Sequence, residues 1–266
     1  MLDTHSAGGG EHYKEVILDI KSVGATYNKM KLHALVCNKQ KQMAKDNSLL
    51  LGHIELTRKQ KEFYDIMTDD KTRIVFVGGP AGTAKTFLSV YSALDLYNSD
   101  KNLKILYLRS VVESADRGIG FLKGDMDDKF GPYMAPLLDK IDELLNKPEK
   151  EQLKNKRVLE AEPINFLRGC TWRDKVVIVD EAQNMSVREL TTVLTRIGRG
   201  SKLFVCGDSL QSDIRNSGFD RLKSLFEDEQ SSKKGVYSVE FCKEDVIRDK
   251  IISYLVEKIE LLAPNQ

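Results

Sequence analysis

The segment that most constrains this chain is glycine-rich and lies at residues 78–86. It reads Gly-Gly-Pro-Ala-Gly-Thr-Ala-Lys-Thr and directly follows the apolar run Ile-Val-Phe-Val at 74–77. This order predicts a strand, a tight turn and a helix that opens at Lys85 and Thr86. Backbone N–H groups at such a turn attract anions. The segment therefore indicates a phosphate-binding loop, and the alternative is an ordinary Gly-Pro turn.

The loop predicts a nucleoside triphosphate ligand, with Lys85 at the β and γ phosphates and the Thr86 hydroxyl on Mg²⁺. Its usual pattern is G-x-x-x-x-G-K-[ST], and Ala84 stands where the second glycine belongs. A helix-opening residue has φ near −60°, where alanine is comfortable, so we expect Ala84 to be tolerated. The predicted phosphate contacts are Gly79, Pro80, Ala81, Gly82, Thr83, Ala84, Lys85 and Thr86.

A second motif places two carboxylates after an apolar run. Val-Val-Ile-Val at 176–179 is followed by Asp180 and Glu181. Buried parallel strands have such continuous apolar runs, and ligands bind at their C-terminal ends. We expect Asp180 to hold Mg²⁺ and Glu181 to orient or deprotonate the attacking water. The alternative is a buried strand that ends in an acidic turn.

Two further segments hold weaker candidates. Asp208 and Gln211 follow another apolar strand, so Gln211 can face the γ-phosphate or position the water, and the alternative is a Gly-Asp turn. Upstream of the loop, Gln60 offers a side-chain amide that can read an adenine edge. The alternative for Gln60 is an ordinary surface glutamine.

Alternating apolar runs and helical patterns predict an α/β fold with a parallel sheet covered by helices on both faces. Residues 111–173 are expected to form an excursion from this sheet, with a charged helical segment at 137–159. The predicted strands are 73–79, 104–110, 176–182, 202–207 and 236–241. The predicted helices are 86–97, 187–197, 219–226 and 245–262.

Length and composition suit one large domain with a short extension. The chain has 266 residues, 41% of them hydrophobic, and a net charge of +1, so any nucleic-acid surface must be a local patch. We expect an N-terminal extension at 1–50, partly flexible and partly a basic helix, and one domain at 51–266. Four separated cysteines, no apolar run of transmembrane length and no signal peptide predict a soluble, cytoplasmic protein.

From about residue 54 to residue 259 the chain resembles the PhoH-like family, phosphate-starvation-inducible ATPases related to the superfamily 1 helicase core. The resemblance rests on long, specific stretches. They are Leu-Arg-Ser-Val-Val-Glu at 108–113, Gly-Phe-Leu-Lys-Gly-Asp-Met at 120–126, Asp-Glu-Ala-Gln-Asn at 180–184, Leu-Thr-Arg-Ile-Gly at 194–198, Gly-Asp-Ser-Leu-Gln-Ser-Asp at 207–213 and Asp-Val-Ile-Arg at 245–248.

The resemblance implies a RecA-like P-loop NTPase fold and an ATP site. Gln60 then looks like the adenine reader, Gln211 like the γ-phosphate sensor, and Arg248 like the arginine near the transferred phosphate. Arg196 is a second candidate for that arginine, acting across a subunit boundary. The alternative for either arginine is a surface salt bridge. Ser110 and Lys123 depart from the family pattern, which usually has proline at both positions.

These expectations favour a Mg²⁺-dependent ATPase that acts on RNA or single-stranded DNA. Superfamily 1 helicases hold a nucleic-acid strand between two motor domains, and this chain has only one. We therefore expect neighbouring subunits to supply the second surface in a ring-like homo-oligomer, most simply a hexamer. One alternative is an ATP-dependent switch that binds a protein partner and no nucleic acid. Another is a nucleotide-binding module without hydrolysis, to which the intact Lys85, Asp180 and Glu181 run counter.

Overall fold

The computed structural model describes residues 48–52, 54–110, 126–164, 171–247, 254 and 258, with the backbone course alone for 126–133 and 163. The described residues from Leu49 onward belong to one compact unit, Leu49–Gln266. The predicted extension at 1–50 therefore lies almost wholly outside the described residues. So do Arg248 and most of the helix predicted at 245–262.

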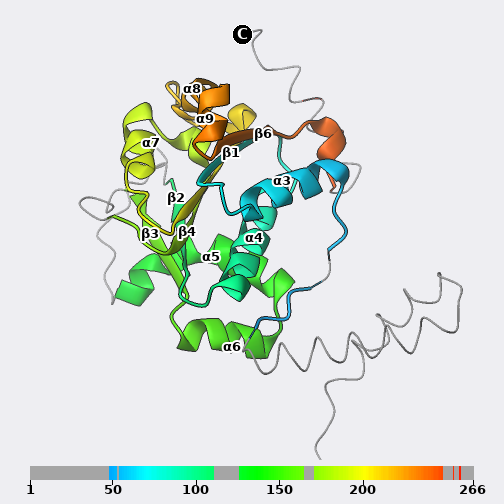
Figure 1. The fold of residues 1–266 in the computed structure, drawn as a ribbon, viewed down its shortest axis with the longest axis vertical. Coiled ribbons are helices and arrows are strands. Elements are labelled where there is room, and N and C mark those ends of the chain that lie inside the picture. Colours follow the sequence, from blue (N-terminus) through cyan, green and yellow to red (C-terminus); the bar gives the residue numbers. More distant parts are fainter. Residues whose placement is uncertain are drawn as a thin grey trace, which may run out of the picture. The chain divides into compact units, whose positions relative to one another are not determined.

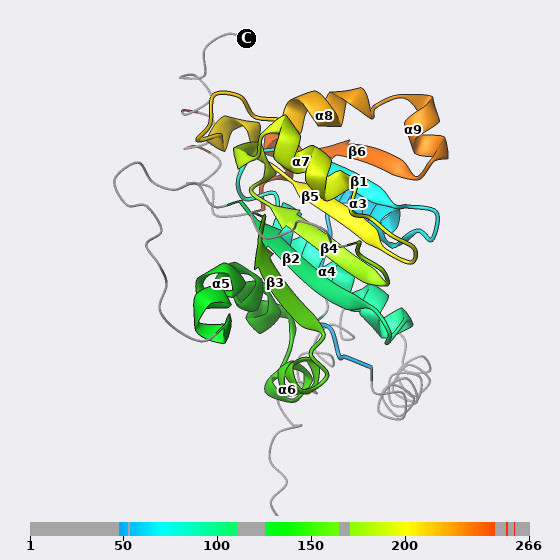
Figure 2. The same ribbon diagram turned by 90° about the vertical axis from the view of Figure 1, so that its left-hand side faces the viewer.

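Six parallel strands form one sheet in the order β3-β2-β4-β5-β1-β6 (Figures 1 and 2). The strands are β1 (Ile74–Gly78), β2 (Lys104–Arg109), β3 (Leu159–Pro163), β4 (Lys175–Asp180), β5 (Lys202–Cys206) and β6 (Val236–Glu240). All five predicted strands are present, each within two residues of its expected ends. Because all strands run the same way, their C-terminal ends meet at one edge of the sheet, where ligands of such folds bind.

Helices cover both faces of the sheet, as predicted for a RecA-like α/β fold (Figure 2). Alternate strand residues divide between two cores: Val75, Ile178 and Phe204 face one way, while Phe76 and Val177 face the other. The first core also contains residues of α3 (Arg58–Thr68), α4 (Lys85–Ser99), α5 (Met126–Leu144) and α6 (Lys147–Asn155). The second contains residues of α7 (Val187–Leu194) and α8 (Phe219–Leu225). The short α9 (Glu229–Lys233) precedes β6.

The expected excursion at 111–173 is wrong in one respect, because its end returns to the sheet. The charged segment predicted at 137–159 is split between α5 and α6, and β3 then pairs with β2 as an edge strand. Its sequence, Leu-Glu-Ala-Glu-Pro, has no continuous apolar run. An edge strand needs none, since charged residues and proline protect an open edge.

Helix ends explain two further differences from the sequence prediction. The helix expected at 187–197 begins with a capping box between Ser186 and Glu189 but ends at Leu194. Ile197 instead makes a bridge to Trp172. Near the C-terminus, Lys243–Asp245 form a 3-10 turn and Val246 is extended, so no helix starts at Asp245. Among the described residues, no helix combines the length and apolar character needed to cross a membrane.

Candidate nucleotide-binding site

The glycine-rich loop joins β1 to α4 at the C-terminal edge of the sheet. Gly79 and Gly82 have φ of 133° and 87°, values that side chains disfavour. A Cβ at Gly79 would also lie 2.7 Å from the Cβ and carbonyl oxygen of Phe241. Glycine at 79 is therefore required by both the backbone and the close approach of the chain after β6. Thr83 is fully buried and its hydroxyl closes the loop by donating to the Pro80 carbonyl at 3.0 Å.

The expected conformation of Ala84 is wrong. Ala84 precedes α4 as its N-cap, with φ of 65° and ψ of 24°, in the left-handed region instead of the helical one. This conformation costs an L-residue roughly 1–2 kcal/mol. The loop must reverse sharply before the first helical N–H groups, and a left-handed residue makes that reversal. Glycine would therefore suit this position for its backbone freedom as well as for its small size.

Lys85 lies beneath the loop that precedes it. Its Nζ donates to the carbonyl oxygens of Gly79 at 2.6 Å and Pro80 at 2.9 Å. Burial lowers the pKa of Lys85, while the Asp208 carboxylate acts in the opposite direction. The ammonium group is thus held by neutral carbonyls, which an incoming phosphate can replace with full negative charges.

Asp180 connects the tip of β4 to the first turn of α4. The Thr86 hydroxyl donates to Asp180 Oδ1 at 2.8 Å, and the phenol of Tyr107 donates to Oδ2 at 2.5 Å. Asp180 is buried, so both donors offset the loss of water around its carboxylate. The sequence predicted that Thr86 and Asp180 would meet at a metal site, and the fold brings their oxygens into contact.

Glu181 follows Asp180 in a left-handed conformation, with φ of 54°. One carboxylate oxygen lies 3.5 Å from Arg109 Nη2, and the other accepts from Gln183 Nε2 at 2.6 Å. Side chains along a strand point alternately to the two faces of the sheet, and a left-handed residue at the strand's end turns its side chain away from that pattern. Strained backbone of this kind is concentrated at functional sites.

Gln183 links the segment after β4 to the segment after β5. Its Oε1 accepts from the Asp208 backbone N–H at 3.0 Å, and its Nε2 lies 3.5 Å from the Gln211 carbonyl. Gln183 is buried, whereas Gln211 is exposed on the turn Ser209–Gln211. Burial raises the pKa of Asp208, and the Lys85 ammonium opposes that rise. One amide thus connects the carboxylate of Glu181 with the segment that presents Asp208 and Gln211.

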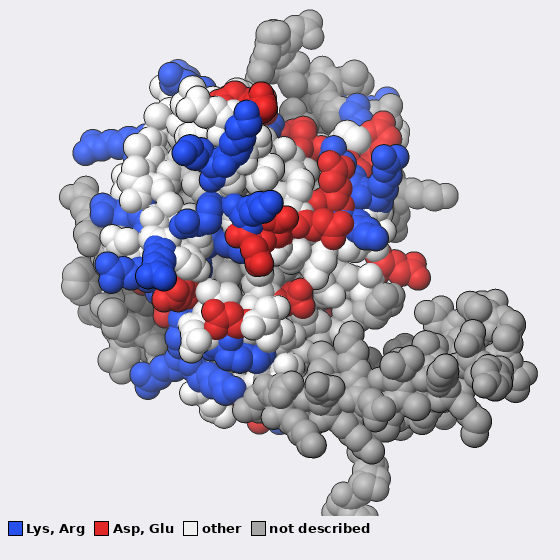
Figure 3. Space-filling model, viewed as in Figure 1, with Lys and Arg blue, Asp and Glu red and all other residues white. Residues whose placement is uncertain are grey.

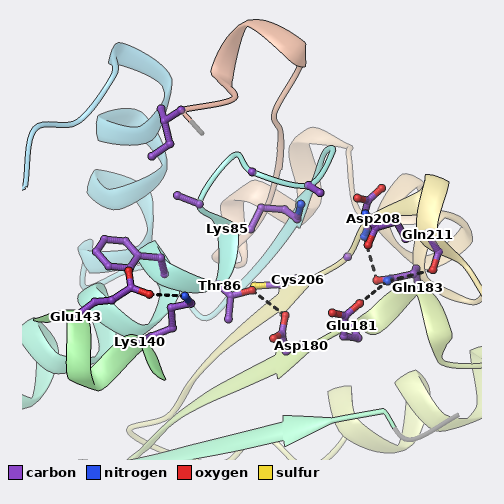
Figure 4. Close-up of a pocket in the computed structure, with 16 residues that line it drawn as sticks. Lys85, Thr86, Lys140, Glu143, Asp180, Glu181, Gln183, Cys206, Asp208 and Gln211 are labelled. Carbon is purple, nitrogen blue, oxygen red and sulfur yellow. Dashed lines mark hydrogen bonds and ion pairs between the residues drawn. The ribbon is translucent and has the colours of Figure 1, made fainter. Parts of the chain in front are cut away.

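Most of the predicted site residues line one cavity of about 460 Å³ (Figure 4). The predicted residues in its wall are Ala81, Gly82, Ala84, Lys85, Thr86, Asp180, Glu181 and Gln211. In Figure 4 the Thr86–Asp180 pair lies between the Lys140–Glu143 pair and the Glu181–Gln183 pair, with Lys85 above it and with Asp208 and Gln211 on the far side from Lys140. Gly79, Pro80 and Thr83 are not in the wall, and their contribution is to the conformation of the loop.

Two other predicted residues lie elsewhere in the described part of the chain. Gln60 is buried and is outside the cavity wall: its amide accepts from the Thr57 N–H and lies 3.5 Å from the Thr83 carbonyl. Arg196 follows α7, and its carbonyl accepts from the Trp172 N–H ahead of β4. β4 spans roughly 15–20 Å. Arg196 therefore lies near the N-terminal ends of the strands, whereas Asp180 lies at their C-terminal ends.

Several residues near the site were missed by the sequence analysis as functional candidates. Arg109 and Gln183 lie in two of the stretches that carry the family resemblance, at 108–113 and 180–184, but the sequence assigns neither of them a role. Tyr107 looked like one more apolar strand residue. Lys140 and Glu143 line the cavity from α5, where they form an ion pair at 2.6 Å, and only a helical spacing of three could have paired them. Ile247 also lines the cavity, and its N–H donates to the Gly82 carbonyl at 3.2 Å.

The donor set fits a magnesium ion shared with a nucleotide. Thr86 and Asp180 offer hydroxyl and carboxylate oxygens, and Mg²⁺ is usually bound through one or two such groups together with water and phosphate. Within the described ranges, no cluster of three or more His, Cys, Asp or Glu side chains forms a closed metal site. The residues present therefore suit a Mg²⁺ ion that enters the site bound to the phosphates of a nucleotide.

Comparison with known proteins identifies one family. The model of the PhoH family, described as "PhoH-like protein", matches residues 54–260. A PhoH-like protein of Bacillus subtilis (strain 168) is 33% identical over 204 residues, which cover 76% of this chain and 62% of that protein. A PhoH-like protein of Synechocystis is 34% identical over 236 residues, with 86% and 70% covered. Protein PhoH of Escherichia coli (strain K12) is 31% identical over 202 residues, with 74% and 55% covered.

Solved structures show only distant similarity. The large terminase of a thermophilic bacteriophage aligns with a TM-score of 0.43 and 13% identity, over 75% of this chain and 49% of that one. The Pif1 helicase from Candida albicans aligns with a TM-score of 0.33 and 17% identity, over 71% and 41%. These scores are too low to bear on the site.

Proposed function

Because this chain belongs to the PhoH family, we propose that it is a Mg²⁺-dependent ATPase that acts on RNA or single-stranded DNA as a homo-oligomer. Family membership and the fold support a P-loop NTPase. ATP as the nucleotide, hydrolysis, the nucleic acid and the oligomer are parts of the proposal.

The observation that carries the proposal is the contact between Thr86 and Asp180. The two residues are far apart in sequence, yet their side-chain oxygens are 2.8 Å apart at the mouth of the phosphate-binding loop. Lys85 and Glu181 line the same cavity. A cation, a hydroxyl and two carboxylates around one space are the groups that phosphoryl transfer to water requires.

In the proposed reaction each residue has a separate task. Lys85 neutralises the β and γ phosphates, and Thr86 with Asp180 holds Mg²⁺, which would draw charge from the transferred phosphate. Glu181 orients the attacking water and takes its proton. Gln211 contacts the γ-phosphate. In the loop from Gly79 to Ala84, every residue except Pro80, which has no N–H, offers a backbone donor to the phosphates.

Three roles depend on residues outside the cavity wall. We propose that Gln60 reads the adenine edge, which requires its amide to exchange at least one present partner on binding. Arg248 is proposed beside the transferred phosphate and lies outside the described residues. Arg196 lies at the far edge of the sheet, so it can serve an ATP site only in a neighbouring subunit. Such a role requires an oligomer, and we propose a ring with a hexamer as its size.

The charge distribution allows only local contact with nucleic acid. Basic and acidic side chains are mixed on the face shown in Figure 3, in keeping with a net charge of +1. Near-zero net charge also favours the second candidate, an ATP-dependent switch for a protein partner. We further propose a cytoplasmic location, which the four separated cysteines suit.

The decisive experiment measures ATP turnover with and without single-stranded RNA and DNA, alongside the mass of the protein in solution. We expect Mg²⁺-dependent turnover that rises with single strands, and binding to them that weakens steeply with salt. Lys85→Ala supplies the inactive control. Turnover without any effect of nucleic acid would favour the protein-binding switch. Nucleotide binding without turnover would mean a module that does not hydrolyse ATP.

A further inference from the structure

Tyr107 is a buried residue that contacts the proposed metal-holding carboxylate from behind. Its Oη donates to Asp180 Oδ2 at 2.5 Å, while the Thr86 hydroxyl donates to Oδ1 at 2.8 Å. Each oxygen of the Asp180 carboxylate therefore has its own hydroxyl donor. Two donors on opposite oxygens restrict rotation of the carboxylate about its last torsion.

The position of the phenol is set by the sheet. Strand β2 lies beside β4, with Tyr107 opposite Ile178 and Arg109 opposite Asp180. Residues two apart on a strand share a face, so Tyr107, Ile178 and Asp180 face the same side. That side is covered by α4, whose first turn carries Thr86. The donor is thus held by buried, hydrogen-bonded strands.

The two donors differ in their access to the cavity. Thr86 lines the cavity, so its hydroxyl can change partners when a cation and phosphates enter. Tyr107 is fully buried and is not part of the wall, so its hydroxyl has no such alternative. A tyrosine phenol ordinarily keeps its proton up to about pH 10, so Tyr107 is a donor to Asp180.

We propose that Tyr107 is a positioning residue for the divalent cation: it holds Asp180 Oδ2 and thereby leaves Oδ1 as the oxygen presented to Mg²⁺. This inference rests on the proposed Mg²⁺-dependent nucleotide site and deepens it. Hydrogen-bond partners of a metal ligand fix the ligand's orientation, and their loss typically lowers metal affinity about 10- to 100-fold.

A plainer role for Tyr107 is that of a core tyrosine whose hydroxyl merely finds a partner. Both roles predict that loss of the hydroxyl lowers stability, because Asp180 would keep a buried oxygen without a donor. Only the positioning role predicts a change in cation affinity at constant nucleotide affinity. The test must therefore separate these two quantities.

The experiment compares Tyr107→Phe with the parent in a Mg²⁺ titration of fluorescent ADP binding, with a parallel measurement in EDTA. We expect the Mg²⁺ concentration at half-saturation to rise about tenfold and the affinity in EDTA to stay within about twofold. Tyr64→Phe is the matched control, because it removes a tyrosine-to-aspartate hydrogen bond of 2.7 Å, to Asp95, outside the cavity wall. Its Mg²⁺ titration should equal that of the parent.

Tyr107→Met, which removes the hydroxyl with a different shape, should shift the Mg²⁺ titration in the same direction. A folded Tyr107→Phe protein with an unchanged titration would overturn the inference alone. Failure of both variants to fold would assign Tyr107 to stability and would also overturn it. A parent that binds ADP equally with and without Mg²⁺ would instead overturn the proposed function, and this inference with it.

Discussion

The guanidinium of Arg109 lies 3.5 Å from the carboxylate of Glu181, at the tips of two neighbouring parallel strands. Both side chains are about one-third exposed, so the pair contributes at most about 1 kcal/mol to stability. Its significance lies in where it holds Glu181. Together with Gln183, Arg109 occupies both oxygens of the proposed catalytic carboxylate.

We predict that Arg109→Ala lowers kcat about 10- to 100-fold, because a displaced carboxylate no longer meets the attacking water. The nucleotide dissociation constant should change little, since Arg109 is not in the cavity wall. Steady-state kinetics with separate binding measurements check both statements. Arg109→Lys should recover part of the activity, and Arg188→Ala, an exposed arginine on α7, should match the parent. An increase in kcat would mean that Arg109 restrains Glu181 instead of positioning it.

The Glu181→Gln variant should retain Mg²⁺-dependent ATP binding and lose turnover by about 10² to 10⁴. The amide keeps the size of the side chain and its place beside Gln183, but it cannot take a proton from water. Binding is followed with a fluorescent nucleotide and turnover by phosphate release. Turnover at the parent rate would remove Glu181 from the assigned role.

The Ala84→Gly variant should be more stable than the parent by roughly 0.5–1 kcal/mol, with a Tm higher by about 1–4 °C. Relief of the left-handed alanine exceeds the entropic cost of a new glycine. Ala81→Gly is the control, because Ala81 has no positive φ and should only lose stability. Thermal unfolding measures both variants. A gain in nucleotide affinity well above tenfold, more than about 1.4 kcal/mol, would show that Ala84 also impairs the site.

Mixing two inactive variants tests the proposed ring. Lys85→Ala subunits should not bind ATP but still carry Arg196. Arg196→Ala subunits should bind ATP, but in a ring of this variant alone no neighbour supplies the arginine. An arginine supplied across a boundary can raise turnover about 10³- to 10⁵-fold, so mixed rings should recover measurable activity. Each variant alone supplies the baseline. A monomeric mass at micromolar concentration together with full activity would contradict both the ring and the role of Arg196.

Much of the site could be read from local sequence because its parts are local. The order of strand, glycine-rich turn and Lys85-Thr86 needs only neighbouring residues to be recognised, and so does the apolar run that ends in Asp180 and Glu181. Five strands were predicted because buried parallel strands are continuously apolar. The edge strand β3 was missed because its alternating glutamates carry no such signal.

The sequence by itself determined the fold class, the glycine-rich loop between a strand and a helix, and the two acidic residues at the end of a strand, since each follows from short-range pattern and residue chemistry. Only the tertiary structure decided how these parts meet. It placed Tyr107 and Arg109 on β2 beside the acidic end of β4, and Gln183 between Glu181 and Asp208. It also gave Ala84 a left-handed backbone. The physical reason is that strand neighbours and turn dihedrals depend on the order of strands in the sheet and on the closure of the loop, and neither is a property of adjacent residues.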